Sequence, residues 1–158
     1  MKTDMALPDN HRIDEEKYRS LLKYIRLSVT EKYDFPQEIV QIDGVTIATL
    51  GNFSASTGKA KSKKTFNICT IVAAALTNGT VLNYKASFLD GKRRILYIDT
   101  EQSPFHCKRV LKRILLLADL PPTVQPETLE FLSLRRYAPK IRLAIIEKAI
   151  YQTDGLGL

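Results

Sequence analysis

The sequence predicts an α/β fold built around a parallel sheet. Apolar runs typical of strands alternate with stretches that have helical periodicity. The runs cover residues 46–50, 95–99 and 129–134, and the helical stretches that follow them cover 65–76, 104–117 and 140–152. This alternation favours parallel strands joined by right-handed crossovers, and the run Ile95-Leu-Tyr-Ile is typical of a strand covered on both faces. With 158 residues, 44% of them hydrophobic, the chain is long enough for one domain with a core and too short for two.

A helix and a hairpin precede this alternation. Apolar side chains recur at three- and four-residue spacings from Ile13 to about Val29, which predicts one amphipathic helix. The pattern is broken at Asp34-Phe-Pro. The segments EIVQI and VTIATL then flank Asp43-Gly44, a pair typical of a two-residue β-hairpin turn. We therefore expect an N-terminal helical extension over residues 1–35 and an α/β domain over residues 36–158.

A long connection, residues 77–94, joins the helical stretch 65–76 to the strand at 95–99. It contains Asn78-Gly79 and Asp90-Gly91 as turn signals, and connections of this length are usually functional or disordered. A small additional hairpin is an alternative that the sequence leaves open. At the far end, residues 155–158 resemble the first residues of a further strand.

The chain is basic, with a net charge of +7, and its basic residues are clustered. The clusters comprise Lys59, Lys61, Lys63, Lys64, Lys92, Arg93, Arg94, Lys108, Arg109, Lys112, Arg113, Arg135 and Arg136. Such clusters suit polyanionic partners, either nucleotide phosphates or nucleic acid. The alternative is that they are solvated faces without a partner.

The cysteines and the hydropathy pattern indicate the compartment. Cys69 and Cys107 have no metal-ligand spacing, which favours a reducing environment. The N-terminal residues contain no apolar signal segment, and no run is long enough to span a bilayer. We therefore expect a soluble, cytoplasmic protein with no membrane partner.

Residues 46–66 have the order of strand, small-residue loop and buried helix that a phosphate-binding loop requires. The motif is glycine, four residues, glycine, lysine, then serine or threonine. Its candidate residues here are Gly58, Lys59, Ala60, Lys61, Ser62, Lys63, Lys64 and Thr65. Backbone N–H groups would curl around the phosphates, Lys64 would reach the β- and γ-phosphates, and the Thr65 hydroxyl would bind Mg²⁺.

Lys63 stands where the motif has its second glycine. If that position needs a positive φ angle, a lysine there costs about 1 kcal/mol of backbone strain. A shifted register with Gly51 and Gly58 leaves six residues between the glycines and puts Ala60 at the hydroxyl position, so it is rejected. The remaining alternative is a solvated basic loop that binds no nucleotide.

Two carboxylates follow the strand at 95–99. Because ligands of open α/β sheets bind at the carboxyl ends of the strands, Asp99 and Glu101 should face one crevice with Thr65. Glu101 is the candidate for the base that orients or deprotonates an attacking water, directly or through Mg²⁺, and Asp99 is the alternative, with a contact to the metal through water. Both could instead only be favoured by the dipole of the next helix. His106 and Cys107 are neighbours on that helix and point apart, so both are interpreted as structural.

The segments GNFSASTGKAKSKKTF and ILYIDTEQSPFHCKRVLKRI resemble the RecA-type P-loop ATPases, and within them the RepA-helicase-like ATPases of plasmids and mobilizable elements from Bacteroides-type bacteria. The resemblance covers roughly residues 36–158. It implies a RecA-like core with ATP and Mg²⁺ as cofactors, phosphate-loop roles for Gly58, Lys64 and Thr65, and a catalytic glutamate at Glu101. The family's Walker B strand and later strands would follow Leu158, so the resemblance implies a core that is incomplete at its C-terminus.

These observations predict an ATP-binding, RecA-like ATPase that forms homo-oligomers at full length and acts on DNA in replication or mobilization of a mobile element. The resemblance implies ATP binding, and it does not secure hydrolysis by these residues alone. The alternative is a basic α/β module that binds nucleic acid by charge without productive ATPase activity. A third alternative, a small-molecule or nucleoside kinase built on the same loop, rests only on Arg135 and Arg136.

Overall fold

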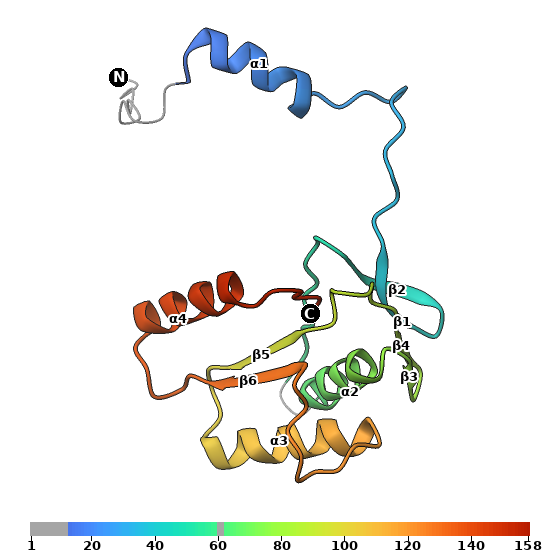
Figure 1. The fold of residues 1–158 in the computed structure, drawn as a ribbon, viewed down its shortest axis with the longest axis vertical. Coiled ribbons are helices and arrows are strands. Elements are labelled where there is room, and N and C mark those ends of the chain that lie inside the picture. Colours follow the sequence, from blue (N-terminus) through green and yellow to red (C-terminus); the bar gives the residue numbers. More distant parts are fainter. Residues whose placement is uncertain (1–12, 60–61) are drawn as a thin grey trace. The chain divides into compact units, whose positions relative to one another are not determined.

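A computed structural model of the chain describes residues 13–59 and 62–158. Contacts within the chain divide it into two units, Met1–Phe35 and Pro36–Leu158. In these ranges the elements follow in the order α1, β1, β2, α2, β3, β4, β5, α3, β6 and α4 (Figure 1). In the part of the chain so described, no helix combines the length and the apolar character needed to cross a membrane.

The described residues of the first unit, 13–35, form one helix, α1 (Glu15–Ile25). Asp14 caps it, since its side chain accepts a hydrogen bond from the backbone N–H of Lys17 at 2.8 Å. Two glutamates in the first turn suit the positive end of the helix dipole. The predicted amphipathic helix is thus confirmed in kind, although residues 26–29 are not helical, and no residue of α1 is buried.

In the second unit, β1 (Glu38–Ile42) and β2 (Val45–Thr49) form the predicted hairpin. The turn residues Asp43 and Gly44 both have positive φ angles, 49° and 79°, as a tight two-residue turn requires. The other edge of β1 pairs with β4 (Tyr84–Ala86), and β4 pairs with β3 (Thr80–Val81). The connection 77–94 therefore does hold a small hairpin, which extends an antiparallel sheet of order β2-β1-β4-β3.

A second, parallel sheet contains β5 (Ile95–Asp99) and β6 (Leu129–Ser133). The strands pair in register, and the rings of Tyr97 and Phe131 stack with centroids 4.4 Å apart. Helices α2 (Lys64–Thr77) and α3 (Pro104–Leu117) lie on one side of these strands and α4 (Pro139–Gln152) on the other (Figure 1). The prediction of parallel strands with covering helices is confirmed for this half of the domain.

Residues 155–158 run along the other edge of β5. Arg94 and Leu156 form a parallel bridge, and the Leu96 N–H donates to the carbonyl of Leu158 at 2.8 Å. The segment thus pairs as the start of a strand would.

One expected strand does not join the parallel sheet. The alternation predicted residues 46–50 as a strand of the same parallel sheet as residues 95–99, yet among the described residues β2 pairs only with β1, in the antiparallel sense. The short turn at Asp43-Gly44 keeps β2 folded against β1, so the prediction of one parallel sheet is wrong at this strand. An open apolar groove of about 1160 Å³ separates β2 from β5, and its lining includes Ile47, Leu50, Ile68, Ile71, Tyr97 and Leu158.

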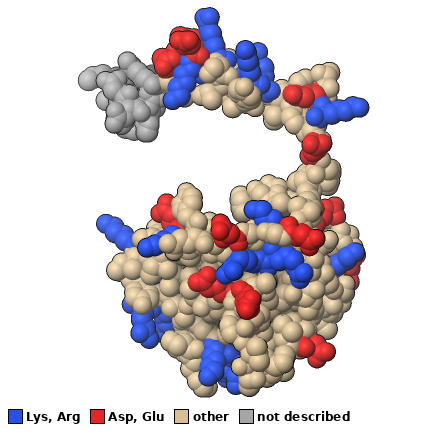
Figure 2. All heavy atoms as spheres, in the orientation of Figure 1, with Lys and Arg blue, Asp and Glu red and all other residues tan. Residues whose placement is uncertain are grey.

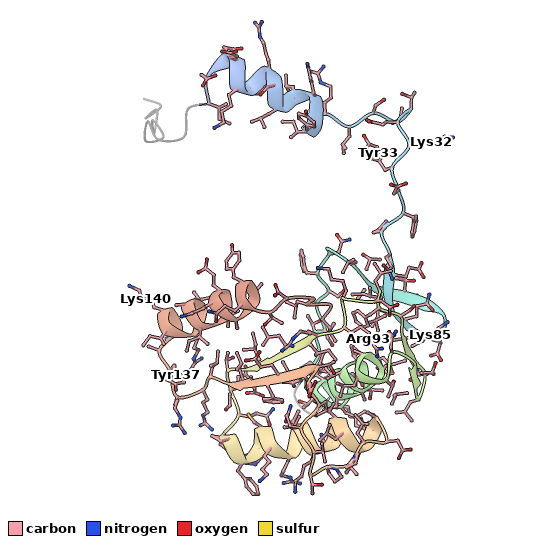
Figure 3. The ribbon with its side chains drawn as sticks, viewed as in Figure 1. Lys32, Tyr33, Lys85, Arg93, Tyr137 and Lys140 are labelled. Atoms are coloured by element: carbon pink, nitrogen blue, oxygen red, sulfur yellow. The ribbon has the colours of Figure 1, made fainter. Side chains whose placement is uncertain are left out.

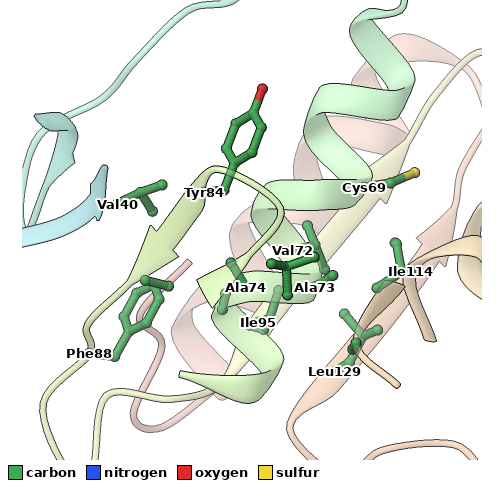
Figure 4. Close-up of a cluster of buried hydrophobic side chains, with 14 of the residues drawn as sticks. Val40, Cys69, Val72, Ala73, Ala74, Tyr84, Phe88, Ile95, Ile114 and Leu129 are labelled. Carbon is green, nitrogen blue, oxygen red and sulfur yellow. The ribbon is translucent and has the colours of Figure 1, made fainter. Parts of the chain in front are cut away.

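Helix α2 lies at the centre of the core. It is apolar around its whole circumference, with buried residues Cys69, Thr70, Val72, Ala73, Ala74 and Ala75. Figure 4 shows these side chains between those of the antiparallel sheet region and those of α3 and β6 (Val40, Tyr84 and Phe88 on one side, Ile114 and Leu129 on the other). The small alanines let the neighbouring elements approach the helix closely, which fixes the position of its N-terminal end.

Candidate phosphate-binding site

The candidate site is the loop between β2 and α2, together with the first turn of α2. The chain leaves β2 after Thr49, and the Ser54 hydroxyl donates to the carbonyl of Ile47, which ties the loop back to its strand. Two of the predicted site residues, Ala60 and Lys61, lie outside the described residues. The others, Gly58, Lys59, Ser62, Lys63, Lys64 and Thr65, are all described.

Lys63 occupies the left-handed region of backbone conformation, with φ 60° and ψ 20°. It is the N-cap residue of α2, and it makes no side-chain capping hydrogen bond. The position that the motif gives to a second glycine therefore does have a positive φ angle. A lysine in this conformation stores about 1 kcal/mol of strain that a glycine would not.

The start of α2 presents free backbone donors. The first N–H groups of a helix have no partner within the helix, and here those of Lys64, Thr65 and Phe66 have no acceptor among the described residues. The next N–H, of Asn67, already donates to the carbonyl of Lys63 at 3.1 Å. Three donors at the positive end of the helix dipole form an arrangement that favours an anion.

Gly58 allows the loop to close tightly. A Cβ atom at this position would come within 2.6 Å of the Ser62 hydroxyl oxygen, closer than real Cβ contacts. The Ser62 N–H donates to the carbonyl of Lys59 at 3.3 Å, which makes a turn within the same loop. A side chain at residue 58 would thus displace the Ser62 hydroxyl, so glycine serves close approach here rather than an unusual φ angle.

The Lys64 side chain is held inside this loop. Its Nζ donates to the carbonyl oxygens of Gly58 at 2.6 Å and Lys59 at 3.0 Å. The ammonium group is half-buried and has no carboxylate partner among the described residues. Nζ also donates to the Ser62 hydroxyl at 3.5 Å, and because all three acceptors are neutral, the ammonium keeps its full charge.

A pocket of about 570 Å³ adjoins the start of α2. It is lined by Ser62, Lys63, Lys64, Thr65, Phe66 and Arg113. The described lining holds three cationic side chains and no carboxylate. Of the predicted loop residues, Ser62, Lys63, Lys64 and Thr65 line this pocket. No sequence pattern singles out Arg113, because only the packing of α3 beside α2 brings it to the pocket.

The Asp99 carboxylate hydrogen-bonds within the turn that follows β5. Asp99 is 8% exposed, and its Oδ1 accepts from the N–H groups of Glu101 at 2.9 Å and Gln102 at 2.7 Å. Its Oδ2 accepts from the side-chain amide of Gln102 at 2.8 Å. The carboxylate therefore shapes the end of β5. Glu101, two residues on, is exposed and makes no side-chain hydrogen bond among the described residues.

Tyr97, Cys69 and Cys107 are titratable side chains of β5, α2 and α3. Burial, followed by the nearby Cys69, Asp99 and Cys107, raises the pKa of Tyr97 to about 12. Burial also raises the pKa of Cys69, an effect that the neighbouring guanidinium of Arg113 partly opposes. Cys69 is therefore a neutral, buried thiol, unlike reactive cysteines. Cys107 is buried, and its thiol lies 3.5 Å from the Ser133 hydroxyl oxygen.

His106, Arg93 and Arg142 make hydrogen bonds with hydroxyl or carbonyl oxygens of the chain. His106 pairs through Nδ1 with the Ser103 hydroxyl at 2.9 Å. Arg93 donates to the carbonyl of Leu76 at 3.4 Å, at the carboxyl end of α2 (Figure 3). Arg142 donates to the carbonyls of Arg135 at 2.7 Å and Tyr137 at 2.6 Å, which fixes the turn that carries Arg135 and Arg136.

Basic and acidic side chains are interspersed over the face of residues 36–158 seen in Figure 2. On α3, by contrast, Lys108, Arg109, Lys112 and Arg113 are all exposed and make no salt bridge among the described residues. Among those same residues, no three His, Cys, Asp or Glu side chains gather as ligands of a metal ion.

The described part of the candidate site thus gathers Ser62, Lys63, Lys64 and Thr65 at one pocket. The lining of that pocket includes none of Gly58, Lys59, Asp99 and Glu101. Comparison with protein-family models, with curated proteins and with solved structures finds no match to this chain.

Proposed function

We propose that this chain is an ATP-binding domain of the RecA-like type, which acts on DNA during replication or mobilization of a mobile element. The observation that carries the proposal is the start of α2, where Lys64, a left-handed Lys63 and three N–H groups without an acceptor among the described residues lie at one pocket. The apolar strand, the tight loop and the buried helix in this order support it. The pocket volume, about 570 Å³, suits a small-molecule ligand.

In this proposal the residues have distinct roles. The N–H groups of Lys64, Thr65 and Phe66 bind phosphate oxygens, and Lys64 exchanges its loop carbonyls for the β- and γ-phosphates. The Thr65 hydroxyl is the group that would hold Mg²⁺, which neutralises phosphate charge when bound. Glu101, whose side chain makes no hydrogen bond among the described residues, would orient the attacking water. Homo-oligomers of the full-length protein would bind DNA through exposed basic residues such as those of α3.

The second candidate is a basic module that binds nucleic acid without using ATP. The exposed, unpaired cations of α3 favour it, because phosphate contacts from lysine and arginine supply most non-specific affinity for nucleic acids. Under this alternative the cations around the α2 start would be part of the same basic surface rather than a nucleotide site.

The first experiment is a titration with a fluorescent ATP analogue, with and without Mg²⁺. The unaltered chain should bind it saturably, and Lys64→Ala should weaken binding by about 100-fold, because charge-assisted hydrogen bonds to phosphate contribute about 1.5–3 kcal/mol each. Lys85→Ala, on β4, removes an equal charge from an exposed strand residue and should leave binding unchanged. Thermal unfolding of each variant checks that the fold is intact.

Equal affinity in Lys64→Ala and the unaltered chain would rule out the nucleotide site. Steeply salt-dependent DNA binding that is indifferent to ATP and to the Lys64 change would then establish the basic module.

A further inference from the structure

Helices α2 and α3 pack side by side, and this packing brings Arg113 to the candidate phosphate site. Arg113 lines the pocket together with residues 62–66, and its guanidinium lies beside the Cys69 side chain, one turn further along α2. The backbone position of Arg113 is fixed, because Val110 and Ile114 on the same helix are buried in the core.

The guanidinium has no anionic partner in the described part of the chain. Arg113 is exposed and makes no salt bridge there. The neighbouring Cys69 thiol is fully buried, which raises its pKa, so it stays neutral and does not pair with the arginine as a thiolate. The charge of Arg113 is therefore directed at the pocket without being neutralised.

We propose that Arg113 is a further binding residue of this site and that it contacts the polyphosphate chain of the nucleotide. The inference rests on the proposed function. A guanidinium binds phosphate oxygens with two parallel hydrogen bonds, and the rest of the described lining supplies only cations, hydroxyls, backbone donors and one aromatic ring. Arg113 thus adds, from α3, a third positive charge to those that Lys63 and Lys64 bring to the pocket.

Neighbouring cations of α3 do not share this placement. Lys108, Arg109 and Lys112 are exposed on the same helix, and none of them lines the pocket. Arg109, one turn before Arg113, carries the same side chain and so offers a matched control.

The test compares Arg113→Ala, Arg113→Lys and Arg109→Ala in the full chain. A fluorescent ATP analogue is displaced by ATP and, separately, by inorganic triphosphate. Arg113→Ala should weaken both competitors by about tenfold, Arg113→Lys should recover part of that affinity, and Arg109→Ala should change neither by more than about twofold. All three variants should unfold at the temperature of the unaltered chain, since both positions are exposed.

Three results would overturn the inference. Arg113→Ala could bind like the unaltered chain, it could lose affinity for ATP and not for triphosphate, or Arg109→Ala could lose as much. If the Lys64→Ala effect is present while Arg113→Ala binds normally, only this inference fails. If the unaltered chain binds no nucleotide, the proposed function fails and this inference fails with it.

Discussion

Two strand–loop–helix units of this domain close their turns with opposite chemistry. In the unit β2–α2 the turn is held by a cation, because Lys64 donates to the carbonyls of Gly58 and Lys59. In the unit β5–α3 it is held by an anion, because Asp99 accepts from the N–H groups of Glu101 and Gln102. The same backbone task is thus done once by occupying carbonyls and once by occupying N–H groups.

The difference shows which of the two turns can bind a phosphate. The first turn leaves the N–H groups of Lys64, Thr65 and Phe66 without an acceptor among the described residues, beside the ammonium group of Lys64, and this arrangement favours an anion. The second already contains its own anion, buried and bonded on both carboxylate oxygens. The proposed phosphate site therefore lies at the first turn, while the carboxylate of the second supports the fold.

The largest expected effect comes from removing the internal anion. Asp99→Ala deletes three hydrogen bonds and leaves the N–H groups of Glu101 and Gln102 in a half-buried turn, so it should destabilise the domain by about 2–4 kcal/mol. Urea denaturation measures the loss. A stability equal to that of the unaltered chain would show that the turn does not depend on its carboxylate.

Tyr97, on β5, gives the domain a pH dependence. Burial first, and then the nearby Cys69, Asp99 and Cys107, raises the pKa of Tyr97 to about 12, while an unfolded chain has a tyrosine pKa of about 10. Above pH 10 the unfolded chain releases this proton first, so the stabilising contribution is complete below pH 10 and falls as the pH rises towards 12.

Tyr97→Phe should remove that part of the alkaline loss, about 1–2 kcal/mol after allowance for partial exposure. Denaturation curves of both proteins between about pH 9 and 12 measure it. If the free energies of unfolding of the two proteins fell equally with rising pH, the raised pKa of Tyr97 would be contradicted. Because other groups also titrate in this range, only the difference between the proteins is informative.

Sequence patterns predict the local parts of this comparison. The turn at Asp43-Gly44, the strand at 95–99 and the helix that begins at Pro104 each depend on neighbouring residues, and all are present. Lys63 is a further example, because the motif alone indicated a position with a positive φ angle, and the observed φ is 60°.

Contacts between residues far apart in the chain could not be predicted from sequence patterns. β4 pairs with the edge of β1 that a simple alternation of strands and helices leaves open, and no local pattern indicates this pairing. Arg113 reaches its pocket only through packing of two helices. The role of Asp99 in its own turn could not be predicted either, since only the geometry of the turn decides which carboxylate the N–H groups contact.

A smaller effect is expected at the strained cap of the first turn. Lys63→Gly should stabilise the domain by about 1 kcal/mol, because glycine adopts the left-handed conformation without a steric penalty. Lys59→Gly is the matched control. It removes the same charge from the same loop at a residue without a positive φ angle, so it should stabilise nothing. Chemical denaturation of both variants measures the difference, and equal effects would mean that charge rather than strain is responsible.

The smallest effect on stability is expected at Glu101. Its side chain is exposed and makes no hydrogen bond among the described residues, so Glu101→Gln should change the free energy of unfolding by less than about 0.5 kcal/mol. The same change should leave affinity for an ATP analogue within about twofold, because the pocket lining does not include this residue. Any ATP turnover by the chain should nevertheless be lost, since an amide cannot act as a base.

Residue 99 and residue 101 thus make a matched pair, in which one carboxylate supports the fold and the other is free for chemistry. Loss of stability in Glu101→Gln, or turnover that survives it, would break that distinction.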